Sequence, residues 1–130
     1  MFYNVGGVVL EDKKLLVVRK KNGRVECILP GGKQEKGESD LDTLKREFFE
    51  ELGVFIKNIS FLGSYEDKAI FSNDLFHMQA YIVEIEGNIK SDHEIKEFLW
   101  IDRNYKENGI LVSNMLENNI IPVLIKKGLF

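Results

Sequence analysis

The sequence predicts a layered α/β or α+β fold in which a mixed β-sheet carries two helices. Three observations predict it. Short apolar runs typical of strands stand on both sides of one amphipathic helical segment, a glycine-rich segment leads into that helix, and a second helical pattern lies later in the chain. A chain of 130 residues with one such set of elements is expected to form a single domain, residues 1–130.

The composition narrows the class of protein. The chain has 18 Lys and Arg against 21 Asp and Glu, a net charge of −3, whereas proteins that bind duplex nucleic acid usually carry a basic excess. We therefore expect no duplex partner. Cys27 is the single cysteine, which excludes an internal disulfide. The sequence shows no signal peptide and no apolar run long enough to cross a membrane, so we expect a cytoplasmic protein without a membrane partner.

The first elements are predicted to be strands. The apolar runs 5–10 and 15–18 flank a polar turn at 11–14, a pattern that favours a hairpin or near-hairpin. Residues 25–29 are predicted to form a further short strand. That strand leads into segment 29–38, where three glycines and a proline interrupt regular structure.

A helix is predicted to begin after Ser39 and to end before Gly53. Ser39 and Asp42 have the spacing of a capping box, and an acidic residue in the first turn suits the positive end of the helix dipole. Glycine is the usual residue just after a helix. At about 100° per residue, four apolar side chains form one stripe that should face the core. They are Leu41, Leu44, Phe48 and Leu52.

The remaining elements alternate between strands and a helix. The pattern predicts strands over residues 54–62, 75–86 and 97–101. It predicts a second helix over residues 110–119, where apolar residues recur at helical spacing.

Three glutamates lie on one side of the first predicted helix. Glu47, Glu50 and Glu51 are spaced i, i+3 and i+4, next to the apolar stripe. Like charges at this spacing destabilise a helix by a few tenths of a kcal/mol, and Arg46 offsets part of that cost. A divalent cation would offset far more, because Mg²⁺ and Mn²⁺ prefer carboxylate oxygens. The alternative interpretation, a solvated acidic face, remains open at this point.

The segment before the helix favours a phosphate ligand. Gly31 and Gly32 allow close approach of a ligand to the backbone, whose free amides can bind phosphate oxygens. Residues 11–24 carry six basic and two acidic groups, whereas residues 35–51 carry seven acidic and three basic ones. A basic strand region facing an acidic, metal-binding helix suits a polyphosphate substrate. The alternative is that these lysines only solubilise a hairpin.

The same residues match a family signature. The chain reads Gly32, five residues, Glu38, seven residues and then Arg-Glu-Phe-Phe-Glu-Glu-Leu-Gly-Val over residues 46–54. This resembles the complete signature of the Nudix hydrolases, which include MutT-like small nucleotide pyrophosphohydrolases. The resemblance implies an α/β/α sandwich with a mixed β-sheet and a catalytic loop-helix-loop. It also implies hydrolysis, dependent on Mg²⁺ or Mn²⁺, of a phosphoanhydride bond in a nucleoside diphosphate linked to another group.

The resemblance implies roles for individual residues of the signature. The implied metal ligands are the carbonyl of Gly31 and the carboxylates of Glu47, Glu50 and Glu51. Glu47 would ligate metal or orient the attacking water. Arg46 would hold the glutamates in place through charge-assisted hydrogen bonds. Glu38 would support the loop and reach a metal through water.

Further roles fall outside the glutamate cluster. Glu94, six residues before Trp100, resembles the additional carboxylate that serves as ligand or base, and Glu97 is its rival. The candidates for binding the substrate are Arg19, Lys20, Gly32 and Lys33.

The resemblance also indicates a substrate class. The small size resembles the nucleoside triphosphate pyrophosphatases, including those that act on oxidised nucleotides and release a nucleoside monophosphate and pyrophosphate. Hydrolases of ADP-ribose tend to carry a proline shortly beyond the signature, and this chain has none between Pro30 and Pro122. Hydrolysis of another nucleoside diphosphate derivative, such as a sugar nucleotide or dinucleotide, and a non-catalytic nucleotide-binding domain are the alternatives. A monomer and a homodimer both remain open.

Candidate residues for reading the base are few. Asn118 or Asn119 resembles a purine-reading asparagine of the triphosphate branch. Phe71, Phe76 and Tyr81 have rings that can stack on a base, although aromatic residues in an alternating strand more often belong to the core.

Overall fold

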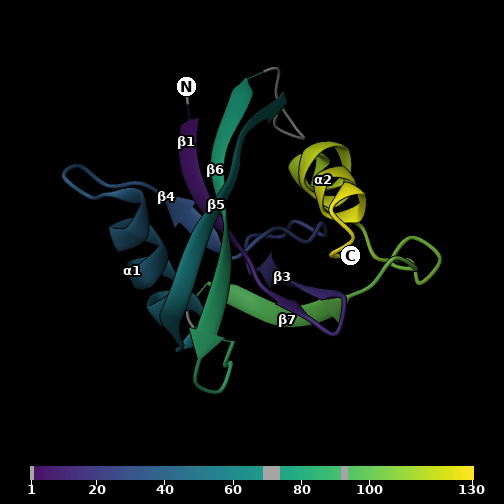
Figure 1. Cartoon of the computed structure of the whole chain (residues 1–130), viewed down its shortest axis with the longest axis horizontal. Helices are drawn as coiled ribbons and strands as arrows, with labels where there is room; N and C mark the ends of the chain where they lie inside the picture. The colour runs from purple at the N-terminus through teal and green to yellow at the C-terminus, as the bar shows by residue number, and fades with distance from the viewer. Residues whose placement is uncertain (1, 69–73, 92–93) are drawn as a thin grey trace.

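The computed structural model describes residues 2–68, 74–91 and 94–130 (Figure 1). The strands are β1 (Phe2–Val8), β2 (Leu10–Glu11), β3 (Lys14–Lys20), β4 (Gly31–Lys33), β5 (Phe55–Lys68), β6 (Leu75–Glu86) and β7 (Ile95–Ile101). The helices are α1 (Asp40–Leu52), the π-helical segment η1 (Leu116–Ile120) and α2 (Ile121–Lys126). In the part of the chain so described, no helix is long and apolar enough to span a membrane.

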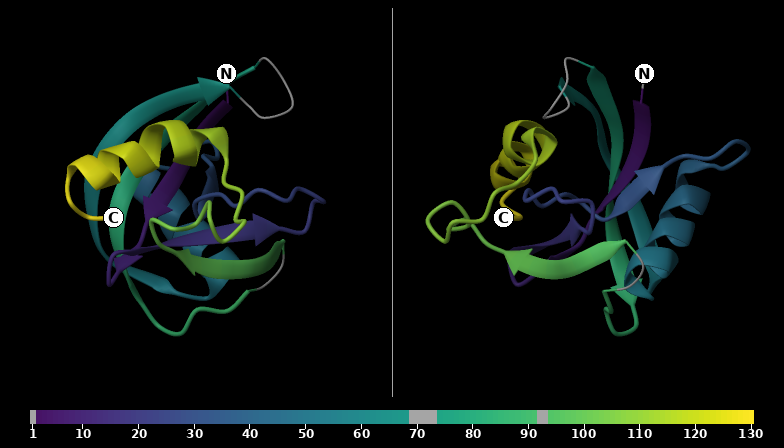
Figure 2. Two further views of the ribbon diagram at one scale, coloured as in Figure 1. Left: turned by 90° about the vertical axis from the view of Figure 1, so that its right-hand side faces the viewer. Right: turned by 180° about the vertical axis from the view of Figure 1, so that it is seen from behind.

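The strands form two sheets. One has the order β4-β1-β6-β5 and the other the order β2-β3-β7. Strand β1 is parallel to β6 and antiparallel to β4, so the mixed sheet predicted from the sequence is confirmed. Helix α1 lies on one side of the four-stranded sheet and α2 on the other, as the opposite views in Figures 1 and 2 show. This is the expected α/β/α arrangement.

Helix α1 packs on the sheet through the predicted apolar stripe. Leu44, Phe48 and Leu52 are fully buried, and Leu41 is partly buried. The ring of Phe48 comes so close to β1 that a Cβ on Gly7 would lie 2.4 Å from it, so this packing requires a glycine. Burial of this stripe sets the rotation of α1, and it leaves the glutamate side of the helix at the rim of the core.

The ends of α1 are those that the sequence predicts. The Ser39 hydroxyl accepts a hydrogen bond from the Asp42 amide, and the Asp42 carboxylate accepts one from the Ser39 amide, each at 3.1 Å. Gly53 ends the helix in the left-handed conformation with φ 67°. Both caps hold the register of the glutamates relative to the loop that precedes the helix.

The prediction of a hairpin over residues 5–10 and 15–18 is wrong in its extent. Strand β1 ends at Val8 and joins β4 and β6, so the first apolar run is divided between two sheets. The hairpin comprises only β2 and β3, with Asp12 and Lys13 in its turn at φ 50° and 61°. Local alternation predicts strands but does not say which sheet a strand joins.

The predicted strand over residues 25–29 is also wrong. This segment makes only two isolated bridges, Ile28 with Val18 and Cys27 with Val112. Pro30 follows directly and has no amide hydrogen with which to continue a ladder.

The predicted helix over residues 110–119 is displaced. Val112 is extended because it bridges Cys27, and the helical segment instead runs through η1 and α2. Pro122 stands in the first turn of α2 and cannot donate a backbone hydrogen bond. The turn before it widens, and the Ile121 amide donates to the Leu116 carbonyl in the spacing of a π-helix.

Candidate active site

The glutamates of α1 differ in exposure because they lie beside its buried stripe. Glu51 is buried, with 5% of its surface exposed. The side chain of Glu47 is 15% exposed and that of Glu50 is 51% exposed. The three carboxylates therefore extend from the protein interior to the solvent along one side of the helix.

Glu51 lies against the glycine-rich loop. Its Oε1 accepts a hydrogen bond of 3.1 Å from the Gly31 amide, and its Oε2 lies 3.7 Å from Lys20 Nζ. Burial raises the pKa of Glu51 to about 7; Lys20 and the Gly31 amide oppose this rise, whereas the charges of Glu47 and Glu94 add to it. A second positive charge at this position would favour the ionised carboxylate.

Arg46 occupies the centre of the acidic side. It donates hydrogen bonds to both oxygens of Glu38, at 2.7 and 2.9 Å, and to Glu47 at 2.8 Å. Longer contacts join it to Glu50 at 3.5 Å and to the Lys33 carbonyl at 3.2 Å. A single guanidinium thus connects α1, β4 and the loop between them.

Glu38 joins the loop to the helix. It accepts hydrogen bonds from the Glu35 amide at 2.9 Å and the Thr43 hydroxyl at 3.1 Å, besides those from Arg46. The Arg46 guanidinium is the main cause that lowers the pKa of Glu38 to about 2. Glu38 therefore stays ionised throughout the neutral range and holds the loop in one conformation.

Gly32 makes room for a catalytic candidate. A Cβ on Gly32 would lie 2.5 Å from the carboxyl carbon of Glu47. The carboxylate thus lies directly against β4, and its burial raises the pKa of Glu47. Only a residue without a side chain allows this contact in its present form.

The donor set fits a divalent cation. Three carboxylates and a nearby backbone carbonyl are the oxygen ligands that Mg²⁺ and Mn²⁺ prefer. Two of the carboxylates, Glu47 and Glu51, are ionisable groups placed in a poorly hydrated position, where an ion would offset the cost of their charge. Among the described residues, no three acidic, histidine or cysteine side chains already converge on one point. Arg46 holds Glu47 and Glu50, while Glu51 faces Gly31.

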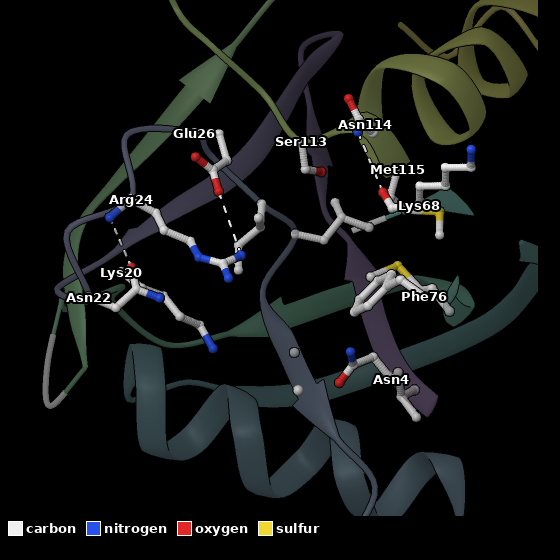
Figure 3. Close-up of a pocket in the computed structure, with 16 residues that line it drawn as sticks. Asn4, Lys20, Asn22, Arg24, Glu26, Lys68, Phe76, Ser113, Asn114 and Met115 are labelled. Atoms are coloured by element: carbon white, nitrogen blue, oxygen red, sulfur yellow. Dashed lines mark hydrogen bonds and ion pairs between the residues drawn. The ribbon is translucent and has the colours of Figure 1, made fainter. Parts of the chain in front are cut away.

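A cavity of about 350 Å³ is lined in part by Lys20 and Gly31, the two residues that contact Glu51. Lys20, Gly31 and Gly32 line it on the side of α1. Its other walls come from segments far apart in the sequence, and Figure 3 shows their side chains around one hollow. Those walls include Asn4, Glu26, Phe76 and Asn114.

Sequence reasoning missed most of this cavity. Asn4, Glu26 and Asn114 were not among the candidates, because no motif or periodicity connects them. Glu26 offers one signal, since it is an acidic residue in a short apolar segment; it is 7% exposed and lies 3.8 Å from Arg24.

The structure separates the two basic candidates of β3. Lys20 reaches Glu51, as described above. Arg19 points elsewhere: it forms an ion pair with Glu97 and donates a 3.0 Å hydrogen bond to the Val25 carbonyl. Lys33 is exposed and does not line the cavity, although its carbonyl binds Arg46.

The candidate carboxylates outside α1 also differ. Glu94 is exposed, and its charge contributes to raising the pKa of Glu51. Its carbonyl accepts a 2.8 Å hydrogen bond from the Lys21 amide. Its rival Glu97 is paired with Arg19.

Only some of the candidates for binding the base line the cavity. Asn118 and Asn119 donate hydrogen bonds to Asp67, at 3.2 and 2.8 Å, and do not line the cavity. Phe76 lines it, whereas Tyr81 bonds to Asp40 at the start of α1. Phe71 lies outside the described residues.

Comparison with known proteins identifies the family of this fold. Residues 2–105 match the family model of the NUDIX domain. The chain belongs to the Nudix hydrolase family, whose members act on pyrophosphate bonds and generally use a divalent metal ion. The family resemblance and the fold class expected from the sequence are thereby confirmed.

Individual relatives carry different names. The chain is 32% identical over 103 residues to an ADP-ribose pyrophosphatase of Methanocaldococcus jannaschii, and the match covers 77% of this chain and 61% of that protein. It is 38% identical over 58 residues to an 8-oxo-dGTP diphosphatase of Buchnera aphidicola, over 45% of this chain and 47% of the relative. The chain thus spans less than two thirds of these relatives.

A solved structure shows the shared fold. The NUDIX hydrolase from Nitrosomonas europaea superposes with a TM-score of 0.77 at 19% identity, over 92% of this chain and 86% of that one.

Proposed function

We propose that the protein hydrolyses nucleoside triphosphates, oxidised or otherwise non-standard ones included, to a nucleoside monophosphate and pyrophosphate with Mg²⁺ or Mn²⁺. One observation carries the proposal: the cavity that holds Phe76 and several side-chain amides is also lined by Gly31 and Lys20, and both of these residues contact Glu51 of α1. A base and sugar in the cavity therefore place their phosphates beside the carboxylates.

Separate residues bind the phosphates, the metal ion and the transferred proton. Lys20 supplies a positive charge at the start of the phosphate chain, and the glycine backbone allows the chain to approach β4 closely. When bound, the divalent ion neutralises the phosphates and makes water more acidic. Arg46 must give up part of its contact with Glu47 and Glu50 as the ion is bound.

A carboxylate accepts the proton of the attacking water. Water adds to one phosphorus of the anhydride, the bridging P–O bond breaks, and the proton passes to the protein. Glu47 suits this role because burial raises its pKa, which makes it a stronger base than an exposed glutamate. Glu94 is the second candidate, and comparison of Glu47→Gln with Glu94→Gln decides between them.

A second function is favoured by a specific observation. The archaeal relative that matches the larger part of this chain is named an ADP-ribose pyrophosphatase. Hydrolysis of ADP-ribose or of a sugar nucleotide would use the same carboxylates, with a sugar phosphate as leaving group instead of pyrophosphate.

The test is product analysis over a panel of canonical and oxidised nucleoside triphosphates, ADP-ribose, sugar nucleotides and dinucleoside polyphosphates, with Mg²⁺ or Mn²⁺. Wild type is compared with Glu50→Gln and with Glu107→Gln, a matched change at an exposed glutamate away from the site. We expect pyrophosphate from a triphosphate, reduced at least 100-fold in Glu50→Gln and unchanged in Glu107→Gln.

Other outcomes contradict the proposal in distinct ways. Turnover of ADP-ribose alone would replace the substrate and keep the site. Tight nucleotide binding without turnover at any metal concentration would indicate a binding domain. Full activity of Glu50→Gln would overturn the assignment of the carboxylates.

A further inference from the structure

A second groove, of about 570 Å³, adjoins the cavity and is strongly basic. Five cationic side chains line it: Arg19, Lys20, Lys21, Arg24 and Lys96. The other described lining residues are glycines, Val25 and Leu111, so none of them is acidic. This concentration of positive charge stands out in a chain whose net charge is −3.

The groove continues the proposed site. Lys20 and Arg24 line both the groove and the cavity, and Lys20 also reaches Glu51. In Figure 3, Lys20 and Arg24 stand together at one side of the cavity, and the Arg24 guanidinium turns toward Glu26. The cavity and the groove thus share two cationic residues where they meet.

Two of the five cations are available for a ligand. Arg19, Lys20 and Arg24 are each paired with a carboxylate, those of Glu97, Glu51 and Glu26 respectively. Lys21 and Lys96 are exposed, and no carboxylate of a described residue forms an ion pair with either. Lys96 lies on β7, and Lys21 follows β3, which pairs with β7.

We propose that this groove binds the phosphodiester backbone of a single-stranded polynucleotide whose 5′ nucleotide occupies the cavity. A row of cations suits regularly spaced phosphates, and neutralising them releases counterions. Val25 and Leu111 are 61% and 60% exposed between the cations, and they offer apolar surface to unstacked bases, which a duplex does not present. The proposal depends on the proposed function only for the placement of the 5′ end.

The test compares two substrates that share a 5′ nucleotide: a 5′-triphosphorylated single strand of twelve nucleotides and the corresponding nucleoside triphosphate. Lys21→Ala/Lys96→Ala removes the available cations. Lys126→Ala/Lys127→Ala removes the same charge from an exposed site on another part of the chain. We expect the groove variant to raise KM for the oligonucleotide roughly tenfold, with kcat and the KM for the mononucleotide within twofold of wild type.

The salt dependence gives a second readout. The slope of log KM against log salt for the oligonucleotide should fall by about 0.7 for each lysine that contacts a phosphate. Lys21→Arg/Lys96→Arg should restore wild-type KM, because it retains both charges. An equal effect of both alanine pairs, or an equal rise of KM for both substrates, would overturn the proposal.

Binding separates this proposal from the proposed function. A 5′-monophosphorylated strand of the same length, labelled at its 3′ end, is followed by fluorescence anisotropy and requires no turnover. Binding that the groove variant weakens and the control variant does not would support the groove even in a protein without triphosphatase activity. Failure to bind, or binding displaced by inorganic polyphosphate but not by an unlabelled strand, would refute it.

Discussion

The two ends of the cavity are built in different ways. The reaction end comes almost entirely from one continuous run of loop and helix, in which Gly31 donates to Glu51 and Arg46 donates to Glu47. The recognition end brings Asn4, Phe76 and Asn114 together from segments that are distant in the sequence. The chemistry is thus encoded locally, whereas the shape that selects a substrate exists only after the whole chain has folded.

The largest effect is expected at the reaction end. Glu47→Gln keeps the size of the side chain but removes a proton acceptor, so kcat should fall by about 10²–10⁴-fold with little change in KM. Steady-state kinetics on a triphosphate measures it. Glu35→Gln, at an exposed carboxylate 3.7 Å from Arg46, is the control and should keep kcat within threefold. An equal loss of kcat in the two variants would show that Glu47 acts only through its charge and not as the proton acceptor.

Glu51→Gln tests the buried carboxylate without a substrate. The folded-state pKa of Glu51 is about 7, above the ordinary 4.5, so the native state binds its proton more tightly than the unfolded state. Ionising Glu51 therefore lowers the stability of the metal-free wild type as pH rises from 4.5 to 7, and the loss is complete above 7.

In EDTA at pH 8, the variant should therefore be more stable than wild type by up to about 3 kcal/mol, and this difference should vanish near pH 4. Urea unfolding at both pH values measures it. Added Mg²⁺ should stabilise wild type and not the variant. A variant that is less stable than wild type at pH 8 would show that the carboxylate contributes to stability rather than costing it.

Arg46→Gln tests the link between loop and helix. Removing hydrogen bonds to partly exposed carboxylates should lower the free energy of unfolding at pH 7 by about 1–2 kcal/mol. The pKa of Glu38 is about 2, below its ordinary 4.5, so its contribution is present above pH 4.5 and is lost as pH falls toward 2. The variant should lose less stability than wild type over that window. Parallel acid-induced losses in the two proteins would contradict this account.

The smallest effect is expected at the recognition end. Asn114→Ala removes an amide that lines the cavity, and one hydrogen bond of about 1 kcal/mol corresponds to a KM for the nucleotide about fivefold higher, with kcat unchanged. Asn118→Ala is the matched control, since Asn118 binds Asp67 and does not line the cavity. If Asn118→Ala raised KM as much as Asn114→Ala, the cavity would not be the recognition site.

The difference between the locally encoded reaction end and the recognition end, which forms only on folding, explains what the sequence could predict. Helix α1, its caps and its glutamate side follow from spacing within a few residues, and the structure agrees with them. The sequence ranks Arg19 just ahead of Lys20 as the phosphate-binding candidate, and it could not show which one faces the cavity. Their directions depend on β7, which pairs with β3 and places Glu97 beside Arg19. The cavity walls could not be predicted, because no local pattern records that residues 4, 26 and 114 will become neighbours.

The errors in secondary structure have the same origin. The periodicity of residues 110–119 is helical, but the chain there pairs with Cys27, and this tertiary contact prevails over local propensity. Pro122 does not end the helical segment, because the turn before it widens to a π-helix that continues directly into α2.

The parallel pairing of β1 with β6 also governs how the protein is made. Phe2 pairs with Phe76 and Val8 with Ile82. Strand β1 therefore gains its first neighbour in the sheet only when β4 has left the ribosome, and its second only when β6 has done so. At a synthesis rate of about 5–20 residues per second, β6 emerges only several seconds after β1. During this interval β1 exposes unpaired backbone and apolar side chains, features that favour binding by a chaperone.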